Sequence, residues 1–369
     1  MGGCNCTDKQ EESSAATFDQ SLKFSVEAKV QQAMKEKDEV AVFDFDSSDP
    51  EDRGTQKRPK ASRLESDFLT QKAVPAQFEP QADHNLKDND ADLRTGPADQ
   101  RDFKAFILMK LTPVARDVYT SIGGFQYMAK ARSPTLVSLS LGDVYYGETS
   151  ADKSPHGFGL LMKTEGSVVE GSWVDGCIHG EGLQVYSNGD SYAGSFERGE
   201  VAGKGKFVNY KGATYEGDWR SSKQNGQGEE TWADGAIYKG NFVDGKKEGY
   251  GRFHWADQAQ YEGEFHNNNL EGQGKYTWSD GRTYEGQWKN NKMHGHGKFS
   301  WPDGKWYEGA YIEDFKNGFG VFSWPNGKKY EGAWKSNKMH GKGVITQPGG
   351  MRTEGEWVEG RLLSTPPST

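Results

Sequence analysis

Three sets of residues in this 369-residue chain have types and spacings that catalysis or ligand binding could use. Gly-x-Gly strings such as GHGKFS and GFGVFS are similar to loops that hold phosphate groups. Four histidines share one position of a repeated pattern: His156, His179, His294 and His340. Glutamates, which can act as general acids or bases, recur at another position of the pattern: Glu216, Glu262, Glu285, Glu308 and Glu331.

A structural reading explains all three sets better than a catalytic one. The Gly-x-Gly strings recur in every repeat, and none opens a helix after a buried strand, which is the context that a phosphate loop requires. The histidine position is filled by other residues elsewhere (Ala202, Asn225, Glu248, Glu271 and Asn317), so we expect turn residues there rather than metal ligands. The glutamates fall on the expected solvent face, one per repeat. We therefore predict no enzyme, no catalytic residue, no metal site and no cofactor.

The amino terminus carries a separate chemical signal. Gly2 follows the initiator methionine, as N-myristoylation requires, and Cys4 and Cys6 lie where S-acylation would follow. Cys6 occupies the position where serine or threonine is preferred. Because one acyl chain binds a membrane only marginally, stable anchoring would need the cysteines as well. We predict lipidation at these three residues; the alternative is an unmodified start with two idle thiols.

A period of 23 residues organises the rest of the chain, and repeats of this length indicate an array. Tyrosine recurs at Tyr192, Tyr215, Tyr238, Tyr261, Tyr284, Tyr307 and Tyr330. A glycine follows each tyrosine at the second position, and an aromatic residue follows that glycine at the second position. Gly-x-Gly pairs begin at 157, 180, 203, 226, 249, 272, 295, 318 and 341.

Alternation within each repeat predicts two short strands. Side chains alternate between the faces of a strand, so Tyr284 and Trp288 should share one face, as should Gly295, Phe299 and Trp301. Asp-Gly and Asn-Gly pairs in PDGK, SDGR and PNGK predict tight hairpin turns, whereas KNNKMH is expected to be a longer polar loop. The predicted fold is an all-β array, an elongated and twisted antiparallel meander of 23-residue hairpins.

Composition divides the chain into four parts. Residues 1–101 are polar and acidic and predict a largely disordered arm, with a short amphipathic helix at 21–40. Residues 102–144 are expected to cap the array. The array itself should span 145–360, about nine full repeats plus a partial one, and 361–369 form a tail. The net charge of −9 shows no basic face, which argues against a nucleic-acid partner.

The pattern YEGxW, GxxHGxG and DG at a 23-residue period resembles the MORN repeat, the membrane occupation and recognition nexus motif. The resemblance covers about residues 145–360. It is weaker where Val169 replaces the tyrosine, where Gln258 replaces a turn glycine, and where Glu230 replaces an aromatic residue. The resemblance implies a structural or tethering role, as in junctophilins, radial spoke head proteins and scaffolds of the protozoan cortex. MORN proteins that are enzymes carry an added kinase or methyltransferase domain, for which we expect no room here.

We predict that aromatic residues line a groove that binds partners: Tyr215, Trp219, Tyr238, Phe242, Tyr261, Phe265, Tyr284, Trp288, Tyr307, Tyr311, Tyr330 and Trp334. The expected function is a scaffold that links a membrane to cytoskeletal or ciliary proteins. Localisation should be cytoplasmic and membrane-associated, at the cytoskeleton or cilium, and the array offers a surface for homodimers.

Two alternatives remain open on the sequence. One is a phosphoinositide or anionic-lipid adaptor, although residues 143–369 carry a net charge of about −5. The lysines that would contact lipid are Lys246, Lys247, Lys289, Lys292, Lys335 and Lys338. The other alternative is a regulatory subunit of an enzyme supplied in trans.

Overall fold

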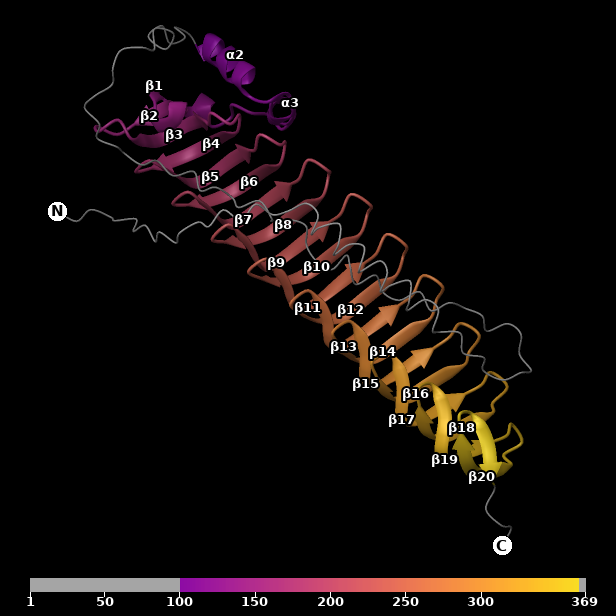
Figure 1. The fold of residues 1–369 in the computed structure, drawn as a ribbon. Coiled ribbons are helices and arrows are strands. Elements are labelled where there is room, and N and C mark those ends of the chain that lie inside the picture. The colour runs from indigo at the N-terminus through magenta and orange to yellow at the C-terminus, as the bar shows by residue number, and fades with distance from the viewer. Residues whose placement is uncertain (1–99, 365–369) are drawn as a thin grey trace, which may run out of the picture. The chain divides into compact units, whose positions relative to one another are not determined.

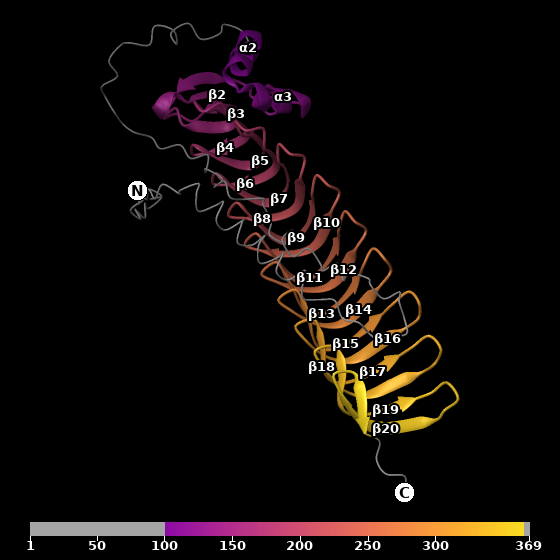
Figure 2. The ribbon, with the colours of Figure 1, turned by 45° about the vertical axis from the view of Figure 1, so that its right-hand side comes forward.

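The computed structural model describes residues 100–364, whose strands form one antiparallel sheet of 21 strands. Each strand pairs with its neighbours in sequence, from β1 (Thr135–Ser138) to β21 (Arg361–Ser364). Figure 1 shows the strands following one another along a single axis, and Figure 2 shows each strand bent across it. The predicted all-β meander is confirmed. The predicted helix at 21–40 lies outside the described residues.

Most of the array consists of seven-residue strands alternating with nine-residue strands. The strands between the first and the last are β2 (Val144–Thr149), β3 (Pro155–Met162), β4 (Val168–Val174), β5 (Cys177–Val185), β6 (Ser191–Glu197), β7 (Glu200–Val208), β8 (Thr214–Arg220), β9 (Lys223–Thr231), β10 (Ile237–Val243), β11 (Lys246–His254), β12 (Gln260–His266), β13 (Asn269–Thr277), β14 (Thr283–Lys289), β15 (Lys292–Ser300), β16 (Trp306–Ile312), β17 (Phe315–Ser323), β18 (Lys329–Lys335), β19 (Lys338–Thr346) and β20 (Arg352–Val358).

The two joints of each repeat have lengths opposite to those predicted. The supposed longer loop is a two-residue turn: Asn290 and Asn291 join β14 to β15 with φ of 49° and 63°. Positive φ at both positions is the conformation of a type I′ turn, which matches the twist of a hairpin. The supposed tight turn spans residues 301–305, where Gly304 alone has positive φ and its N–H donates to the carbonyl of Trp301. That geometry is a type I turn followed by a glycine bulge.

A bulge also interrupts the strict alternation that the sequence predicted. In β15 the register moves from Gly286 opposite Gly297 to Gln287 opposite His294, which leaves Gly295 and His296 as extra residues. Gly295 has a φ of 59°, so it does not continue the face of Phe299. The shared histidine position is therefore a strand residue beside a bulge rather than a turn residue.

Turn residues also join neighbouring repeats. The N–H of Asn291 donates to the carbonyl of Leu270 in the preceding repeat, and its side-chain Oδ1 accepts from the N–H of Leu270 at 2.7 Å. Asn268, Asp314 and Asn337 occupy the same turn position one or two repeats from Asn291. Each makes the same pair of bonds to the repeat that precedes it. In these four turns the side chain thus extends the sheet ladder beyond the end of the hairpin.

Two α-helices and a 3₁₀ helix cover the first repeats on the face opposite the repeated tyrosines: α2 (Gln100–Lys110), α3 (Pro113–Ser121) and η3 (Met128–Lys130). Their buried side chains, among them Phe103, Ile107 and Tyr119, join one hydrophobic cluster with Leu160 and Leu183 of the sheet. Thr112 caps α3 by accepting from the N–H of Ala115, and Pro113 occupies the first turn, where its missing N–H costs nothing.

Glu170 fixes this helical cover to the sheet. Its carboxylate, fully buried, accepts from the hydroxyl of Tyr119 and from the backbone N–H groups of Phe125, Tyr127 and Met128. Burial, together with the charge of Glu170, raises the pKa of Tyr119 far above its usual value, so the hydroxyl stays protonated and donates. The residue that is an exposed glutamate in later repeats is here the centre of a buried hydrogen-bond network.

Candidate binding surface

The repeated tyrosines lie flat on the sheet. The hydroxyl of Tyr284 donates to the carbonyl of Gln287 at 2.9 Å, and its ring covers Gly297 of the next strand. A Cβ on Gly297 would lie 2.3 Å from the Tyr284 hydroxyl oxygen, a separation that real Cβ atoms do not tolerate. Burial raises the pKa of Tyr284 well above its usual range. The repeated glycines therefore make room for the repeated rings.

Edge-to-face contacts join these tyrosines to the aromatic residues of neighbouring repeats. Trp288 meets Tyr284 of its own repeat and Tyr261 of the repeat before, with ring centroids 5.1 and 5.6 Å apart, both perpendicular. Trp288 also donates its indole N–H to the carbonyl of Gly274. The same contacts continue from Tyr192 to Trp357. Each such pair adds about 0.5–1.5 kcal/mol beyond the area that it buries.

All twelve residues of the predicted groove belong to this series of rings, and all are buried. The structure gives them a packing role, which is to hold consecutive repeats together. Their part in binding a partner stays a prediction.

A second row of aromatic residues reaches the surface, and the sequence reasoning left it out of the binding site. We call it the tryptophan strip: Trp232, Phe253, Trp255, Tyr276, Trp278, Phe299, Trp301, Phe322 and Trp324. Neighbouring ring centroids are 4.4 to 5.9 Å apart along its whole length. Four of its five tryptophans are partly exposed, and only Trp255 is buried. The recurrence of tryptophan just before each turn was the signal that could have identified it.

Basic side chains accompany the strip. Arg282, Lys305 and Lys328 lie over Trp278, Trp301 and Trp324, with the charged group 5.6, 5.4 and 4.8 Å from the ring centroid. Such cation–π contacts hold the exposed faces of the indoles in place. The strip is therefore an ordered surface of apolar rings and basic side chains, of which Arg282 and Lys305 also pair with Asp280 and Asp303 at 2.8 and 3.3 Å.

Lys247, one of the six predicted lipid contacts, is fully buried and does not reach the surface. Its Nζ lies 2.6 Å from the carboxylate of Glu230, and it faces the rings of Trp232 and Tyr238. Burial lowers the pKa of Lys247, and the charge of Glu230 opposes that shift. The charge of Glu230, which replaces an aromatic residue of the repeat, is thus neutralised by Lys247 inside the layer of aromatic rings.

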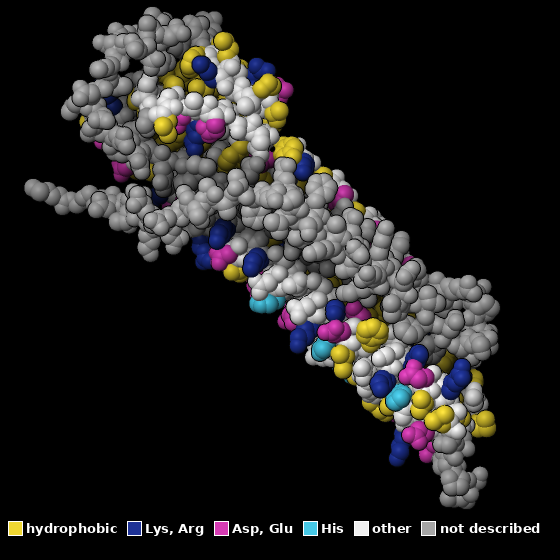
Figure 3. All heavy atoms as spheres, viewed as in Figure 1, with side chains coloured by type: hydrophobic (Ala, Val, Ile, Leu, Met, Phe, Trp, Pro, Cys, Tyr) yellow, Lys and Arg dark blue, Asp and Glu magenta, His cyan; other side chains and the backbone are white. Residues whose placement is uncertain are grey.

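The other predicted lipid contacts lie along the edge formed by the two-residue turns. Lys292 pairs with Glu313 and Lys338 with Glu359, at 2.9 and 2.7 Å, and Lys246 donates to Asn267. Hydrogen bonds from these lysines hold the pKa values of Glu313 and Glu359 below their usual range. Lys289 and Lys335 are exposed. Acidic partners thus offset much of the positive charge that a lipid headgroup would meet, and Figure 3 shows basic and acidic side chains interspersed along one flank.

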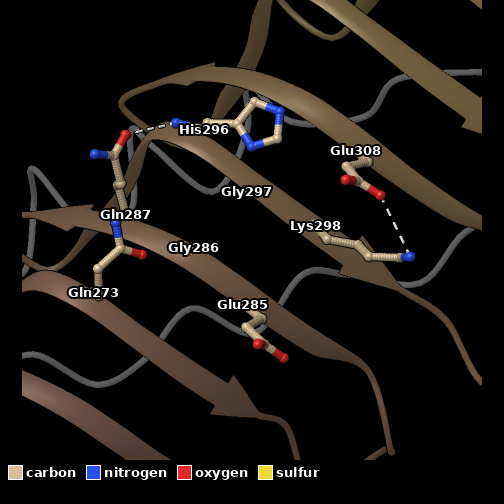
Figure 4. A pocket seen from close by; sticks show the side chains of 8 residues that line it. All are labelled: Gln273, Glu285, Gly286, Gln287, His296, Gly297, Lys298 and Glu308. Atoms are coloured by element: carbon tan, nitrogen blue, oxygen red, sulfur yellow. Dashed lines mark hydrogen bonds and ion pairs between the residues drawn. The ribbon is translucent and has the colours of Figure 1, made fainter.

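The face opposite the tyrosines, which we call the charged face, is crossed by ion pairs between adjacent strands. Glu216, Glu262, Glu285 and Glu308 pair with Lys206, Arg252, Lys275 and Lys298 at 2.8 to 3.9 Å. Figure 4 shows the Lys298–Glu308 pair in a shallow hollow that Gln273, Gln287 and His296 also line. Exposed pairs of this kind contribute little to stability, about 0–1 kcal/mol each. Four of the five glutamates singled out in the sequence therefore neutralise basic partners.

Within residues 100–364 no group of three or more His, Cys, Asp or Glu is placed to bind a metal ion. No helix of that range has the length and apolar character needed to cross a bilayer. Gly2, Cys4 and Cys6 lie outside the described residues.

Comparison with known proteins gives a family and a loose structural likeness. No curated protein matches the sequence significantly. The TCP10 domain of Danio rerio CPAP in complex with a STIL peptide is 13% identical, with a TM-score of 0.31, and the match covers 61% of this chain and all of that domain. The Drosophila melanogaster SAS-4 TCP domain, solved with a proline-rich motif of Ana2, is 12% identical with a TM-score of 0.28, covering 48% and 90%.

The MORN repeat profile matches eight consecutive segments, at residues 170–191, 192–214, 215–237, 238–260, 261–281, 284–306, 307–329 and 330–352. These segments coincide with the hairpins of β4 to β19. The family is one of repeat scaffolds that mediate interactions. The chain is a member of the MORN-repeat family.

Proposed function

We propose that this MORN-repeat protein is a non-enzymatic scaffold that holds cytoskeletal or ciliary protein partners along its array while an acylated amino terminus tethers it to a membrane. The observation that carries the proposal is the tryptophan strip. Binding energy at protein interfaces concentrates in aromatic anchors, tryptophan above all. Partly exposed indoles recur along a rigid sheet at Trp232, Trp278, Trp301 and Trp324, so the strip offers four anchors at fixed positions.

The dimensions of the strip favour a macromolecular partner. Two strands about 4.8 Å apart advance the array by about 10 Å per repeat, so Trp232 and Trp324 lie about 40 Å apart. A small ligand would contact one or two of these indoles, whereas an extended protein segment would contact them all. A second copy of this chain is another partner that the test below would reveal.

The tether is supported by Gly2, Cys4 and Cys6 and by the pairing of the edge lysines. Because Lys247 is buried and three other lysines have acidic or amide partners, the array is poorly equipped to bind an anionic membrane by charge alone. Attachment to a membrane therefore falls to the acylated residues.

The test uses the full chain carrying Trp278→Gln and Trp301→Gln, fused to a proximity-labelling enzyme and expressed in its native cell. The array itself accepts Gln347 and Asn209 at the equivalent repeat position, so the double variant should fold. We expect it to lose the protein neighbours that the wild type labels. The matched control is Tyr210→Gln with Tyr250→Gln, which removes two exposed rings outside the strip and should keep those neighbours. A folded tryptophan variant with unchanged neighbours would refute the proposal.

A further inference from the structure

Lysine replaces an apolar residue at two equivalent positions on the tyrosine face. The position lies just after the two-residue turn, and in five other repeats it is taken by Ile178, Val201, Leu270, Met293 and Met339. In two repeats, three apart, it is Lys247 and Lys316. Both ammonium groups lie against aromatic rings of the layer.

Lys247 shows which group an ammonium in this position binds. Its Nζ lies 4.8 Å from the ring centroid of Trp232 and 5.1 Å from that of Tyr238, and 2.6 Å from the carboxylate of Glu230. Rings alone offset little of the cost of burying a charge, whereas a hydrogen-bonded carboxylate offsets much of it. A carboxylate is therefore the partner that suits a lysine among these rings.

Lys316 has a fuller set of rings and reaches the surface. Its Nζ lies 4.9 to 5.3 Å from the ring centroids of Trp301, Tyr307, Phe322 and Trp334. The lysine is partly exposed, whereas Lys247 is fully buried. Phe299 occupies the position that Glu230 has beside Lys247, and its ring contacts Trp301. The ammonium of Lys316 is thus held in place by rings and accessible to another molecule.

The surroundings of Lys316 on the tryptophan strip are positively charged. Residues 299–306 and 322–329, which carry Trp301 and Trp324, contain one acidic residue, Asp303, against Lys305, Lys328 and Lys329. Asp303 pairs with Lys305, whereas the equivalent residue beside Lys328 is the neutral Asn326.

The nearest acidic residue in sequence to Lys316 is Asp314, whose side chain caps the N–H of Met293 in the preceding repeat. Positive charge therefore exceeds negative charge at this end of the strip.

We propose that Lys316 is a carboxylate-binding site and that the last repeats of the tryptophan strip bind an acidic, extended segment of a partner protein. The proposal rests on the function proposed for the strip, because it specifies the chemistry of the partner that docks there. One carboxylate of the segment pairs with Lys316 as Glu230 pairs with Lys247. Neighbouring carboxylates meet Lys305 and Lys328, and apolar residues between them cover the indoles of Trp301 and Trp324.

The spacing of the strip suits a polyproline II segment. Lys305 and Lys328 lie one repeat, about 10 Å, apart along the array. A polyproline II chain returns the same face every three residues, or about 9.3 Å, so an acidic residue at every third position reaches both lysines. Such chains also bind to aromatic-lined surfaces through their apolar side chains.

The test measures fluorescence anisotropy of a labelled (Glu-Pro-Leu)4 peptide with the full-length protein. The peptide (Lys-Pro-Leu)4 has the same backbone preference and the opposite charge, and we expect it not to bind. Lys316→Met places in this repeat the residue that Met293 and Met339 provide in its neighbours, so the variant should fold. It should weaken binding of the acidic peptide about tenfold, the effect of losing one hydrogen bond between charged groups.

Two further variants separate the site from overall charge. Phe299→Glu rebuilds beside Lys316 the pair that Glu230 forms with Lys247, so it should occupy the ammonium and also weaken the acidic peptide about tenfold. Lys275→Met removes one exposed lysine from the charged face and should change affinity less than about twofold. Far-UV circular dichroism and thermal melting confirm that each variant is folded.

The proposal is overturned if the acidic peptide does not bind, if the basic peptide binds as well, or if Lys316→Met and Lys275→Met have equal effects. Binding that is lost in the Trp278→Gln, Trp301→Gln variant but unchanged in Lys316→Met would overturn this inference and leave the scaffold function standing. A wild-type dimer that Lys316→Met dissociates in sedimentation would make the occupant a second copy of this chain, which also contradicts the proposal.

Discussion

The second residue of the two-residue turn differs from repeat to repeat, and with it the number of bonds between repeats. Asn291 bonds Leu270 through both its backbone N–H and its side chain, whereas Gly245 reaches Gln224 through its backbone N–H. Both residues have positive φ, which asparagine and glycine tolerate better than other residues. A single side chain therefore changes the strength of the interface between repeats without changing the turn.

Asn291→Gly should destabilise the protein by about 1 kcal/mol, because the N–H of Leu270 loses its acceptor while the turn keeps its conformation. The reverse change, Gly245→Asn, should stabilise it by up to about 1 kcal/mol, since an added Cβ meets nothing within 4 Å there. Urea denaturation of both variants checks the pair. Equal effects of one sign would show that the turn side chain does not join the repeats.

The buried tyrosines predict a loss of stability at alkaline pH. Burial raises the pKa of Tyr238, Tyr261 and Tyr284 well above 10, and that of Tyr330 to about 12. The folded state keeps these protons at a pH where the unfolded chain has lost them. The free energy of unfolding should therefore have its full value below pH 10. It should decrease as the pH rises from 10 toward the pKa values of the tyrosines in the folded state.

Denaturant unfolding at pH 8 to 11, followed together with tyrosinate absorbance, measures this effect. We expect most tyrosines of the native protein to ionise only as it unfolds. An unfolding free energy that stays constant from pH 8 to 11 would contradict the assigned burial.

At the scale of elements, the sequence predicted which residues form strands but not how the strands are joined. Alternation of rings and charges placed Tyr284 and Trp288 on one face correctly, because that alternation follows from strand geometry. The sequence analysis assigned the two turn types to the wrong joints. Asn-Asn can adopt the two positive φ values of a two-residue turn, and Asp-Gly suits a three-residue loop as well as a two-residue one. The tryptophan strip was overlooked because the sequence does not show which of two aromatic rows is buried.

The helical cover of the first repeats was expected only as a cap of unspecified form. Its place on the charged face depends on Leu160, Leu183 and Glu170, whose neighbours come from the earlier segment at residues 100–130. Contacts between residues so far apart in sequence leave no periodic signal.

Glu170→Gln should destabilise the cover by about 2 kcal/mol, because bonds from four donors to a buried carboxylate lose their charge. Glu216→Gln changes the same repeat position where it is exposed and should cost almost nothing. Limited proteolysis between residues 100 and 131, with thermal melting, measures both. Similar behaviour of the two variants would show that the network does not hold the cover.

At the scale of the whole molecule, different surfaces of the described part of the chain have different roles. The tyrosine layer holds the repeats together, the tryptophan strip presents aromatic anchors at its edge, and the charged face is crossed by ion pairs. In a nearest-neighbour array each unit needs only the units beside it, so surface residues can differ from repeat to repeat without loss of the fold. The proposed scaffold uses that freedom to carry partners, while the amino terminus carries the membrane attachment.

Quantitative proximity labelling in the native cell by the full chain with and without Gly2→Ala tests this division most directly. Without the myristoyl site the protein should leave the membrane fraction and lose its membrane neighbours. It should keep the cytoskeletal or ciliary proteins that the array holds, since Trp278 and Trp301 are unchanged. If instead Gly2→Ala loses every neighbour, the array holds no partner of its own; if the variant stays on the membrane with all neighbours, the amino terminus is not the tether.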